Sequence, residues 1–223
     1  GIVPKVVAKV GEKVKAGSVL MIDKNRPEIK FVSPVSGEVT AVNRGEKRKV
    51  LSVVVKPEAQ IEYEDFGKKN VASLKREEVK EAILHAGMWP FIKQRPYDIV
   101  ASPADEPRDI FVSAFYSAPL APNFDFVVKG QEVDFQTGLD ALAKLTDGKV
   151  YVGIRKGSSV SVKGVETVEV EGPHPAANVG VQINHIKPIN KGEVVWTVNP
   201  ADVIVIGRLF NKGIADFSRL VVL

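Results

Sequence analysis

The first 56 residues alternate short β-branched runs with turn residues, and this pattern constrains the fold more than any other feature of the chain. Five runs have the character of strands: residues 5–10, 19–23, 29–32, 38–43 and 50–56. Turn-forming residues separate them, at Gly11, Gly17, 25–27, Pro34, Gly37 and Gly45. Short strands at this spacing, with no helical periodicity between them, predict a compact β-sandwich or barrel over residues 1–60.

A polar, charged segment at residues 57–70 predicts a domain boundary. Beyond it, strand and helix patterns alternate, which predicts an open, mostly parallel sheet over residues 61–223. The expected strands are residues 110–115, 149–154, 165–170, 194–198 and 219–223. The expected helices begin with Ser73 as N-cap, at Gln131 with Val133 on the apolar stripe, at Pro175, and at Pro200 with Asn199 as N-cap. The predicted fold class is therefore a two-domain α+β chain, with a small β module before an α/β domain.

Composition excludes several kinds of site. The 223 residues include no cysteine, so disulfides, thiolate nucleophiles and Cys-ligated metals are excluded. Three histidines without a spaced carboxylate make no metal motif, and no Ser/His/Asp arrangement suggests acyl transfer. Every apolar run is too short to cross a bilayer. The chain lacks an initiating Met and stops inside an apolar run, so we expect it to be part of a longer protein.

The densest basic cluster is RGEKRK, residues 44–49, in a chain with a net charge of +4. Such a cluster can contact phosphate groups of lipid or nucleic acid. No aromatic residues are interleaved with it for base stacking, so we expect no nucleic-acid partner. The simplest interpretation is a solvated hairpin turn.

The segment around Lys24 has the character of a lipoyl or biotinyl carrier module. Lipoyl carriers place the acceptor lysine after an Asp at a hairpin tip, as in Asp23-Lys24. Ten positions separate Asp23 from Ser33, more than that pattern leaves, and neither Lys24 nor Lys30 has the flanking Met residues of biotin carriers. We therefore expect a barrel-sandwich hybrid without an attached group. Its enlarged loop, residues 24–28, is predicted to contact another part of an assembly.

The run DKNRPEIKFVSPVSGEVTAVNRGEKRKVLSVV, residues 23–54, closely resembles the N-terminal module of the A subunit of the bacterial sodium-translocating NADH:quinone oxidoreductase. Further similar stretches follow in the same order along the chain. They are GMW (87–89), RP (95–96), IFVSA (110–114), PLA (119–121), GLD (138–140), LTDGKVY (145–151), GPHPA (172–176) and DVIVIGRLF (202–210). No single stretch is decisive, but the ordered series is specific.

This resemblance implies a peripheral subunit on the cytoplasmic face of the bacterial inner membrane, without a transmembrane segment. Its partners would be quinone and the other subunits of a complex that couples NADH oxidation and quinone reduction to sodium export. It would be enzymatic only as part of that complex. The family fold resembles the FMN-carrying subunit of respiratory complex I. That fold implies a biotinyl/lipoyl-like module at residues 1–60 and a Rossmann-like domain at 61–223, ending before a β-grasp domain.

The residues argue against a flavin or NADH site. Such a site needs a glycine-rich turn opening a helix, so that backbone N–H groups approach the phosphate. No G-x-G-x-x-G occurs, the strand at 110–115 is followed by bulky YSAPL, and no helix pattern follows Gly153 and Gly157. We expect no FMN and no covalently attached cofactor, with quinone as the substrate of the complex. A lipoyl- or biotin-type carrier and a flavin- or NADH-binding oxidoreductase domain are the alternatives.

Four residues have the chemistry of a quinone site. A quinone ring needs a flat apolar slot, with a donor or cation near its carbonyl oxygens. Trp89, Phe91 and Arg95 offer this in one segment, although aromatic residues there could equally seal a domain junction. His174 lies between two prolines, and Pro175 is expected to open a helix whose free N–H groups lie beside it. The simpler interpretation of that loop is a structural turn before a capped helix.

Overall fold

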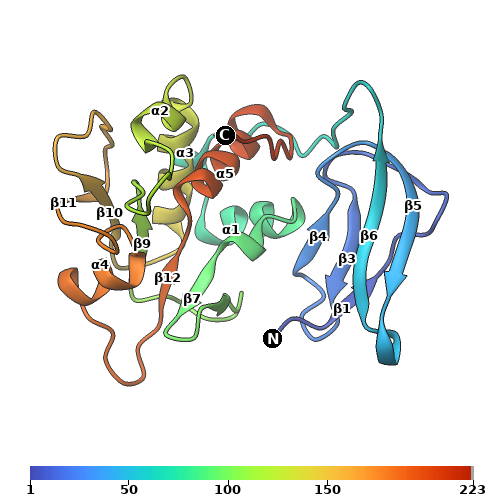
Figure 1. The fold of residues 1–223 in the computed structure, drawn as a ribbon, viewed down its shortest axis with the longest axis horizontal. Helices are drawn as coiled ribbons and strands as arrows, with labels where there is room; N and C mark the ends of the chain where they lie inside the picture. Colours follow the sequence, from blue (N-terminus) through green and yellow to red (C-terminus); the bar gives the residue numbers. More distant parts are fainter. Residues whose placement is uncertain (222–223) are drawn as a thin grey trace.

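The computed structural model describes residues 1–221, and the β module lies beside the α/β domain (Figure 1). The module contains two three-stranded antiparallel sheets, with strand orders β1-β3-β4 and β2-β5-β6. A small core of Ala8, Val14, Leu20 and Val39 lies between them. Four of the five expected strand runs are confirmed, the first forms only over Pro4–Val6 instead of residues 5–10, and the two-residue β2 is additional. The strands are β1 (Pro4–Val6), β2 (Lys13–Val14), β3 (Val19–Asp23), β4 (Lys30–Val32), β5 (Gly37–Arg44) and β6 (Val50–Pro57).

The second domain contains a six-stranded sheet with the order β11-β10-β9-β12-β7-β8. The first four strands in this order are parallel, and β7 and β8 add an antiparallel edge that the sequence pattern did not predict. The expected mostly parallel sheet is therefore confirmed. Its strands are β7 (Lys93–Arg95), β8 (Ile99–Val100), β9 (Ile110–Ser113), β10 (Val150–Arg155), β11 (Glu166–Val170) and β12 (Val195–Thr197).

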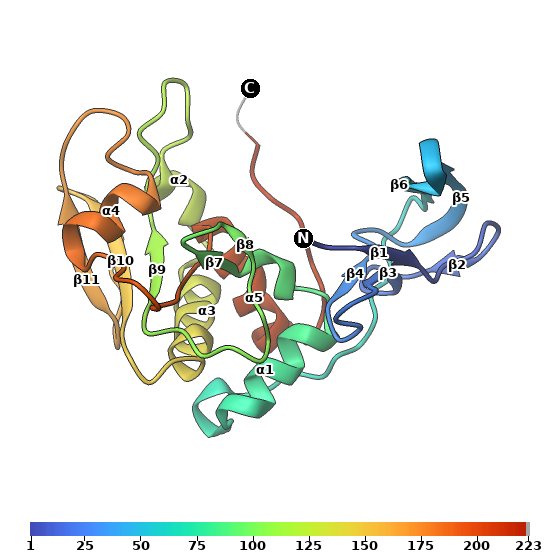
Figure 2. The ribbon, with the colours of Figure 1, turned by 90° about the horizontal axis from the view of Figure 1, so that it is seen from below.

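Helices cover both faces of this sheet, with α1, α3 and α5 on one side and α4 on the other (Figure 2). Alternation along β9 matches this arrangement, because Ile110 and Val112 join the main core while Phe111 packs with Ile183 of α4. The α-helices are α1 (Arg76–His85), α2 (Phe124–Val128), α3 (Glu132–Lys144), α4 (Val179–Ile186) and α5 (Pro200–Lys212). Three short 3₁₀ turns are η1 (Glu46–Arg48), η2 (Val71–Ser73) and η3 (Trp89–Phe91).

Two predicted helix starts are wrong. Helix α1 begins at Arg76 with Lys75 as N-cap, because the Glu78 carboxylate accepts the Lys75 N–H at 2.7 Å; the Ser73 hydroxyl instead donates to the carbonyl of Asn70. Helix α4 begins at Val179 with Asn178 as N-cap, and not at Pro175. Residues 175–178 form turns, with the Asn178 N–H donating to the Pro175 carbonyl at 2.8 Å, and the extended backbone of Asn178 separates these turns from the helix.

Other predictions need smaller corrections. Val133 is not on the buried stripe of α3, since it is 74% exposed and Phe135 takes the core position. No strand forms at 219–221, and residues 222–223 of that predicted strand lie outside the described residues. The cap at Asn199 and the glycine stop at Gly87, with φ of +69°, are as expected. The domain division at residue 60 stays a prediction.

The enlarged loop after β3 lies against the α/β domain. Ile29, at its end, is fully buried in the main core of that domain. The Arg26 guanidinium donates to the carbonyl of Val100 in β8 at 3.5 Å and to the buried Asp23 carboxylate at 3.1 Å. The extra residues therefore fasten the two domains together within this chain.

Helices α3 and α5 approach each other closely through reciprocal glycines. A Cβ atom at Gly138 would lie 2.1 Å from the Val203 carbonyl oxygen, and one at Gly207 would lie 1.7 Å from that of Asp134. Only a residue without a side chain fits at either position. This contact sets the distance between the two longest helices.

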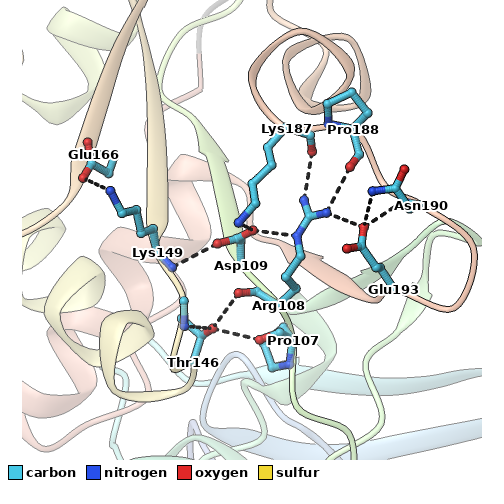
Figure 3. Close-up of polar contacts among 11 residues, drawn as sticks. Pro107, Arg108, Asp109, Thr146, Lys149, Glu166, Lys187, Pro188, Asn190 and Glu193 are labelled. Atoms are coloured by element: carbon cyan, nitrogen blue, oxygen red, sulfur yellow. Dashed lines mark hydrogen bonds and ion pairs between the residues drawn. The ribbon is translucent and has the colours of Figure 1, made fainter.

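A buried carboxylate joins the amino-terminal ends of the central strands (Figure 3). Asp109 is fully buried just before β9, and it accepts the Lys149 N–H at 3.1 Å and the Lys187 ammonium at 2.7 Å. Arg108 donates to Asp109 at 2.7 Å and also binds the carbonyls of Lys187 and Pro188. Burial alone would raise the pKa of Asp109, but these donors outweigh it and hold the pKa below its ordinary value.

We predict that Gly138→Ala and Gly207→Ala each lower the free energy of unfolding by about 2–3 kcal/mol, because the added methyl group collides with a helix carbonyl. Urea unfolding followed by circular dichroism measures this. Gly180→Ala is the matched control, since its Cβ would lie 3.8 Å from the nearest atom. That variant should be neutral or slightly stabilising. Equal effects at all three positions would contradict the close contact.

We predict that Asp109→Asn lowers the free energy of unfolding by about 3 kcal/mol at pH 7, because it leaves Lys187 and Arg108 without their shared anion. The pKa of Asp109 is lower in the folded than in the unfolded state, so its ionised carboxylate stabilises the folded protein above about pH 4. This contribution is lost as the pH falls through the folded-state pKa. The difference between the variant and the parent should therefore shrink at pH 3.

The control for Asp109→Asn is Glu166→Gln, which removes an exposed ion pair with Lys149. It should change the free energy of unfolding by less than about 1 kcal/mol. An Asp109→Asn difference that is as large at pH 3 as at pH 7 would contradict the ionised, donor-matched carboxylate.

Candidate functional site

A cavity of about 910 Å³ opens at the carboxyl ends of β9 and β12. The chain moves outward from β9 to β10 and β11 and then returns to place β12 on the other side of β9, so the strand order reverses at this point. Ligand clefts in open α/β sheets form where the order reverses, because the connections lead away and leave a crevice. The cavity is within the size range of small-molecule sites.

One wall of the cleft comes from η3 and the edge strand β7. Phe91, Lys93 and Arg95 all line it, since alternate residues of a strand face the same side. The Phe91 ring is supported by Phe217, with centroids 6.0 Å apart, and by the Arg219 guanidinium 5.6 Å from its centroid. This wall therefore presents an aromatic ring beside two cations.

Arg95 has a donor with no hydrogen-bond partner. Its Nε atom is buried and makes no hydrogen bond among the described residues, although Asp98 Oδ1 lies 3.4 Å away and attracts it electrostatically. A buried donor without an acceptor is unfavourable, but the Nε atom is closed off from solvent, so it is the exposed part of the guanidinium that faces the cleft.

The opposite wall is the loop that carries His174. The Ser117 hydroxyl lies 3.2 Å from His174 Nδ1 and accepts the Ala177 N–H at 3.0 Å. Ser113, in β9, donates to the Ala177 carbonyl at 2.7 Å and accepts from Gln182 of α4 at 2.9 Å. These contacts hold the histidine loop against the end of β9.

Free backbone donors also line the cleft, but they come from a different place than the sequence predicted. The N–H groups of Val179 and Gly180, in the first turn of α4, have no acceptor within residues 1–221. Pro175 does not open the helix. The free N–H groups lie four residues further along, because residues 175–178 are tied into turns.

A partly buried acid closes the side next to α5. Asp202 pairs with Arg219, and burial raises the pKa of Asp202 above its ordinary value, with Arg219 and Lys93 opposing the shift only in part. Burial also raises the pKa of Tyr116, and the nearby Asp202 charge adds to this effect. The cleft therefore combines hydrogen-bond donors with an acid that is harder to ionise than usual.

Three of the four predicted site residues meet in this cleft, and Trp89 does not. Phe91, Arg95 and His174 line it. Trp89 is fully buried, donates from Nε1 to the carbonyl of Ala101 at 2.9 Å and packs edge-on against Trp196. The turn of η3 directs position 89 into the core and position 91 to the cleft.

The sequence reasoning missed Lys93, Ser117 and Asp202. Lys93 could have been found from its spacing of two from Arg95 in a strand. Ser117 and Asp202 follow the carboxyl ends of predicted parallel strands, where ligand-contacting residues gather. No local signal indicates Arg219, since its role depends on the tail returning to Phe91 and Asp202.

The described part of the chain has no feature of a carrier, metal or membrane-spanning site. Lys24 is exposed and forms neither a side-chain hydrogen bond nor an ion pair within residues 1–221. In the same residues, no group of three or more His, Cys, Asp or Glu is placed to hold a metal ion. No helix in that range is long and apolar enough to cross a bilayer.

Comparison with known proteins gives two family matches. The model of the NqrA N-terminal barrel-sandwich hybrid domain matches residues 1–58, and that of the NqrA second alpha/beta domain matches residues 74–215. Proteins named as the A subunit of Na(+)-translocating NADH-quinone reductase are similar over the whole chain. They include those of Neisseria meningitidis serogroup A (39% identical), Hahella chejuensis (38%) and Yersinia pseudotuberculosis (36%). The chain spans 51% of the length of each.

We predict that Lys24→Ala leaves the free energy of unfolding unchanged within about 0.5 kcal/mol, because the side chain is exposed. Arg26→Ala is the comparison variant, and it should cost about 1–3 kcal/mol because it removes a donor from the buried Asp23 carboxylate. Intact mass of protein from its native host should show no lipoyl or biotinyl adduct. A strongly destabilised Lys24→Ala protein, or an adduct on Lys24, would contradict this prediction.

Proposed function

Because this chain belongs to the NqrA family, we propose that it forms the first two domains of a subunit of a sodium-translocating NADH:quinone reductase and contributes a quinone-binding cleft. The single observation that carries the cleft proposal is the meeting of Phe91, Arg95 and His174 around one cavity where the strand order reverses.

The chemistry of the cleft suits a quinone headgroup. A quinone presents a flat apolar ring and two carbonyl oxygens that accept hydrogen bonds. Phe91 offers a ring face for stacking, and its support by Phe217 keeps it in position. The Arg95 guanidinium and the free N–H groups of α4 would donate to one oxygen, and His174 would donate to another.

The finer fold relation is also a proposal. The order β11-β10-β9-β12 corresponds to the 3-2-1-4 part of the strand order of dinucleotide-binding folds, which supports a Rossmann-like domain related to the FMN-carrying subunit of complex I. Phosphate binding in such folds needs a glycine-rich turn after the first strand. Here β9 is followed by Phe115 to Leu120 without a glycine, which supports quinone rather than FMN as the ligand.

We further propose that the protein lies on the cytoplasmic face of the bacterial inner membrane, with the other subunits of the complex as partners. The redox chemistry would need those subunits, and this chain would bind and orient. The predicted boundary near residue 60 separates the β module from the cleft-bearing domain. The β-grasp domain expected beyond residue 223 belongs to the same proposal.

A quinone titration tests the cleft. Trp89 and Trp196 report on it, because their chain neighbours Pro90 and Thr197 line the cavity. Addition of a soluble short-chain ubiquinone should quench their fluorescence to saturation. Arg95→Gln should weaken binding by about 10- to 100-fold through loss of a charged donor, and Phe91→Ala should weaken it as well.

The matched control is Arg155→Gln, at the exposed end of β10 and outside the cavity. It should leave the quinone Kd unchanged. The same titration is run on this chain and on the full-length protein. Absence of saturable quenching in both would overturn quinone binding. A yellow purified protein, or NADH-dependent diaphorase activity, would favour the flavin alternative.

A further inference from the structure

The hairpin formed by β5 and β6 projects from the β module on the side away from the α/β domain (Figures 1 and 2). Its strands, Gly37–Arg44 and Val50–Pro57, are the longest in the module. The turn between them, η1, lies apart from the elements of the second domain in both views. The base of the hairpin belongs to the module, since β5 pairs with β2 and Val39 lies in the module core, but its tip is free to contact something outside the chain.

The tip of this hairpin is a cluster of cations without acidic partners. Four basic residues are exposed there, and none forms an ion pair within residues 1–221: Arg44, Lys47, Arg48 and Lys49. Lys47 and Arg48 both have left-handed backbones, with φ of 52° and 60°. Two consecutive non-glycine residues seldom adopt this conformation, and they do so more often at contact sites than elsewhere.

An exposed apolar side chain lies beside the charged turn. Leu51 is 63% exposed at the start of β6, and Val54 is 41% exposed on the same strand. The Leu51 side chain also packs over Gly45 at the turn. Charges at the tip and an exposed leucine beside them form the amphipathic pattern of a surface that enters a headgroup layer.

The charge is unevenly shared between the two domains. Residues 1–58 contain 12 of the 31 basic residues but only 6 of the 27 acidic ones, a net charge of +6. The remaining residues contain 19 basic and 21 acidic side chains, a net charge of −2. The field of the molecule therefore turns the β module toward an anionic surface.

We propose that the β5–β6 tip docks on an anionic lipid bilayer, with the four cations at the phosphates and Leu51 in the interface. Residues 32–62 contain no aromatic side chain, which removes base stacking and disfavours single-stranded nucleic acid. Cationic side chains beside an apolar residue suit a fluid lipid surface, which can adapt to them. This inference shares the membrane setting of the proposed function but does not depend on quinone binding.

Sedimentation with lipid vesicles tests the proposal in the absence of quinone, so it can fail independently of the cleft. This chain should bind vesicles of phosphatidylcholine with about 30% phosphatidylglycerol, and the binding should weaken steeply with added salt. It should not bind vesicles of pure phosphatidylcholine. The variant Lys47→Gln/Arg48→Gln/Lys49→Gln should lose about a hundredfold in partitioning, near fivefold for each charge removed. Leu51→Ser should weaken binding severalfold without changing its salt dependence.

The matched control removes three exposed lysines from the second domain, Lys163→Gln/Lys191→Gln/Lys212→Gln. It changes the net charge by the same amount as the tip variant, and its partitioning into vesicles should stay within about threefold of that of the parent. Unchanged circular dichroism and unfolding midpoints exclude misfolding of the tip variant. Equal losses in both triple variants, or a tip variant that binds like the parent, would overturn the proposal. Tighter binding to an oligonucleotide than to the vesicles would assign the tip to nucleic acid instead.

Discussion

The buried carboxylate of Asp109 is the interaction on which the α/β domain depends. It joins its own segment, where the neighbouring Arg108 guanidinium also donates to it, to two distant ones. These contribute the Lys149 N–H and the Lys187 ammonium. A buried charge is tolerated only when donors surround it, so all three segments must be in place together. The amino-terminal ends of β9 and β10 and the approach to β12 are held as one unit.

The Asp109 contacts join the strands at the amino-terminal end of the sheet. Within residues 1–221, no such contacts join them at the carboxyl end, and the cleft lies there. At the carboxyl ends of β9 and β12 the connections diverge, and the space between them is left to side chains and solvent. The close contact of Gly138 and Gly207 fixes α5, and with it Asp202 at the cleft wall. The polar groups of the cleft are thus positioned by a rigid framework rather than by one another.

Much of this could be predicted from the sequence. The strands of the β module, the parallel core of the sheet and the Asn199 cap follow from local periodicity and turn chemistry. Phe91, Arg95 and His174 were recognisable as cleft chemistry. Trp89 was not separable from Phe91, because only the turn of η3 decides which ring faces the core. The predicted start of α4 is wrong because Asn178 adopts an extended backbone, which separates the turns at 175–178 from the helix.

By itself, the sequence determined the order and type of most elements, because apolar periods of 2 and 3.6 and the residues that break them are local properties. It also indicated which aromatic, basic and imidazole side chains are candidates for a ligand cleft. The tertiary structure alone decided which of them meet. Arg95 reaches the cleft because β7 pairs with β12. In this pairing Arg95 lies opposite Val195, which is 100 positions away in the sequence. Such a pairing depends on the edge that the assembled sheet leaves open, and no local pattern of residues encodes it.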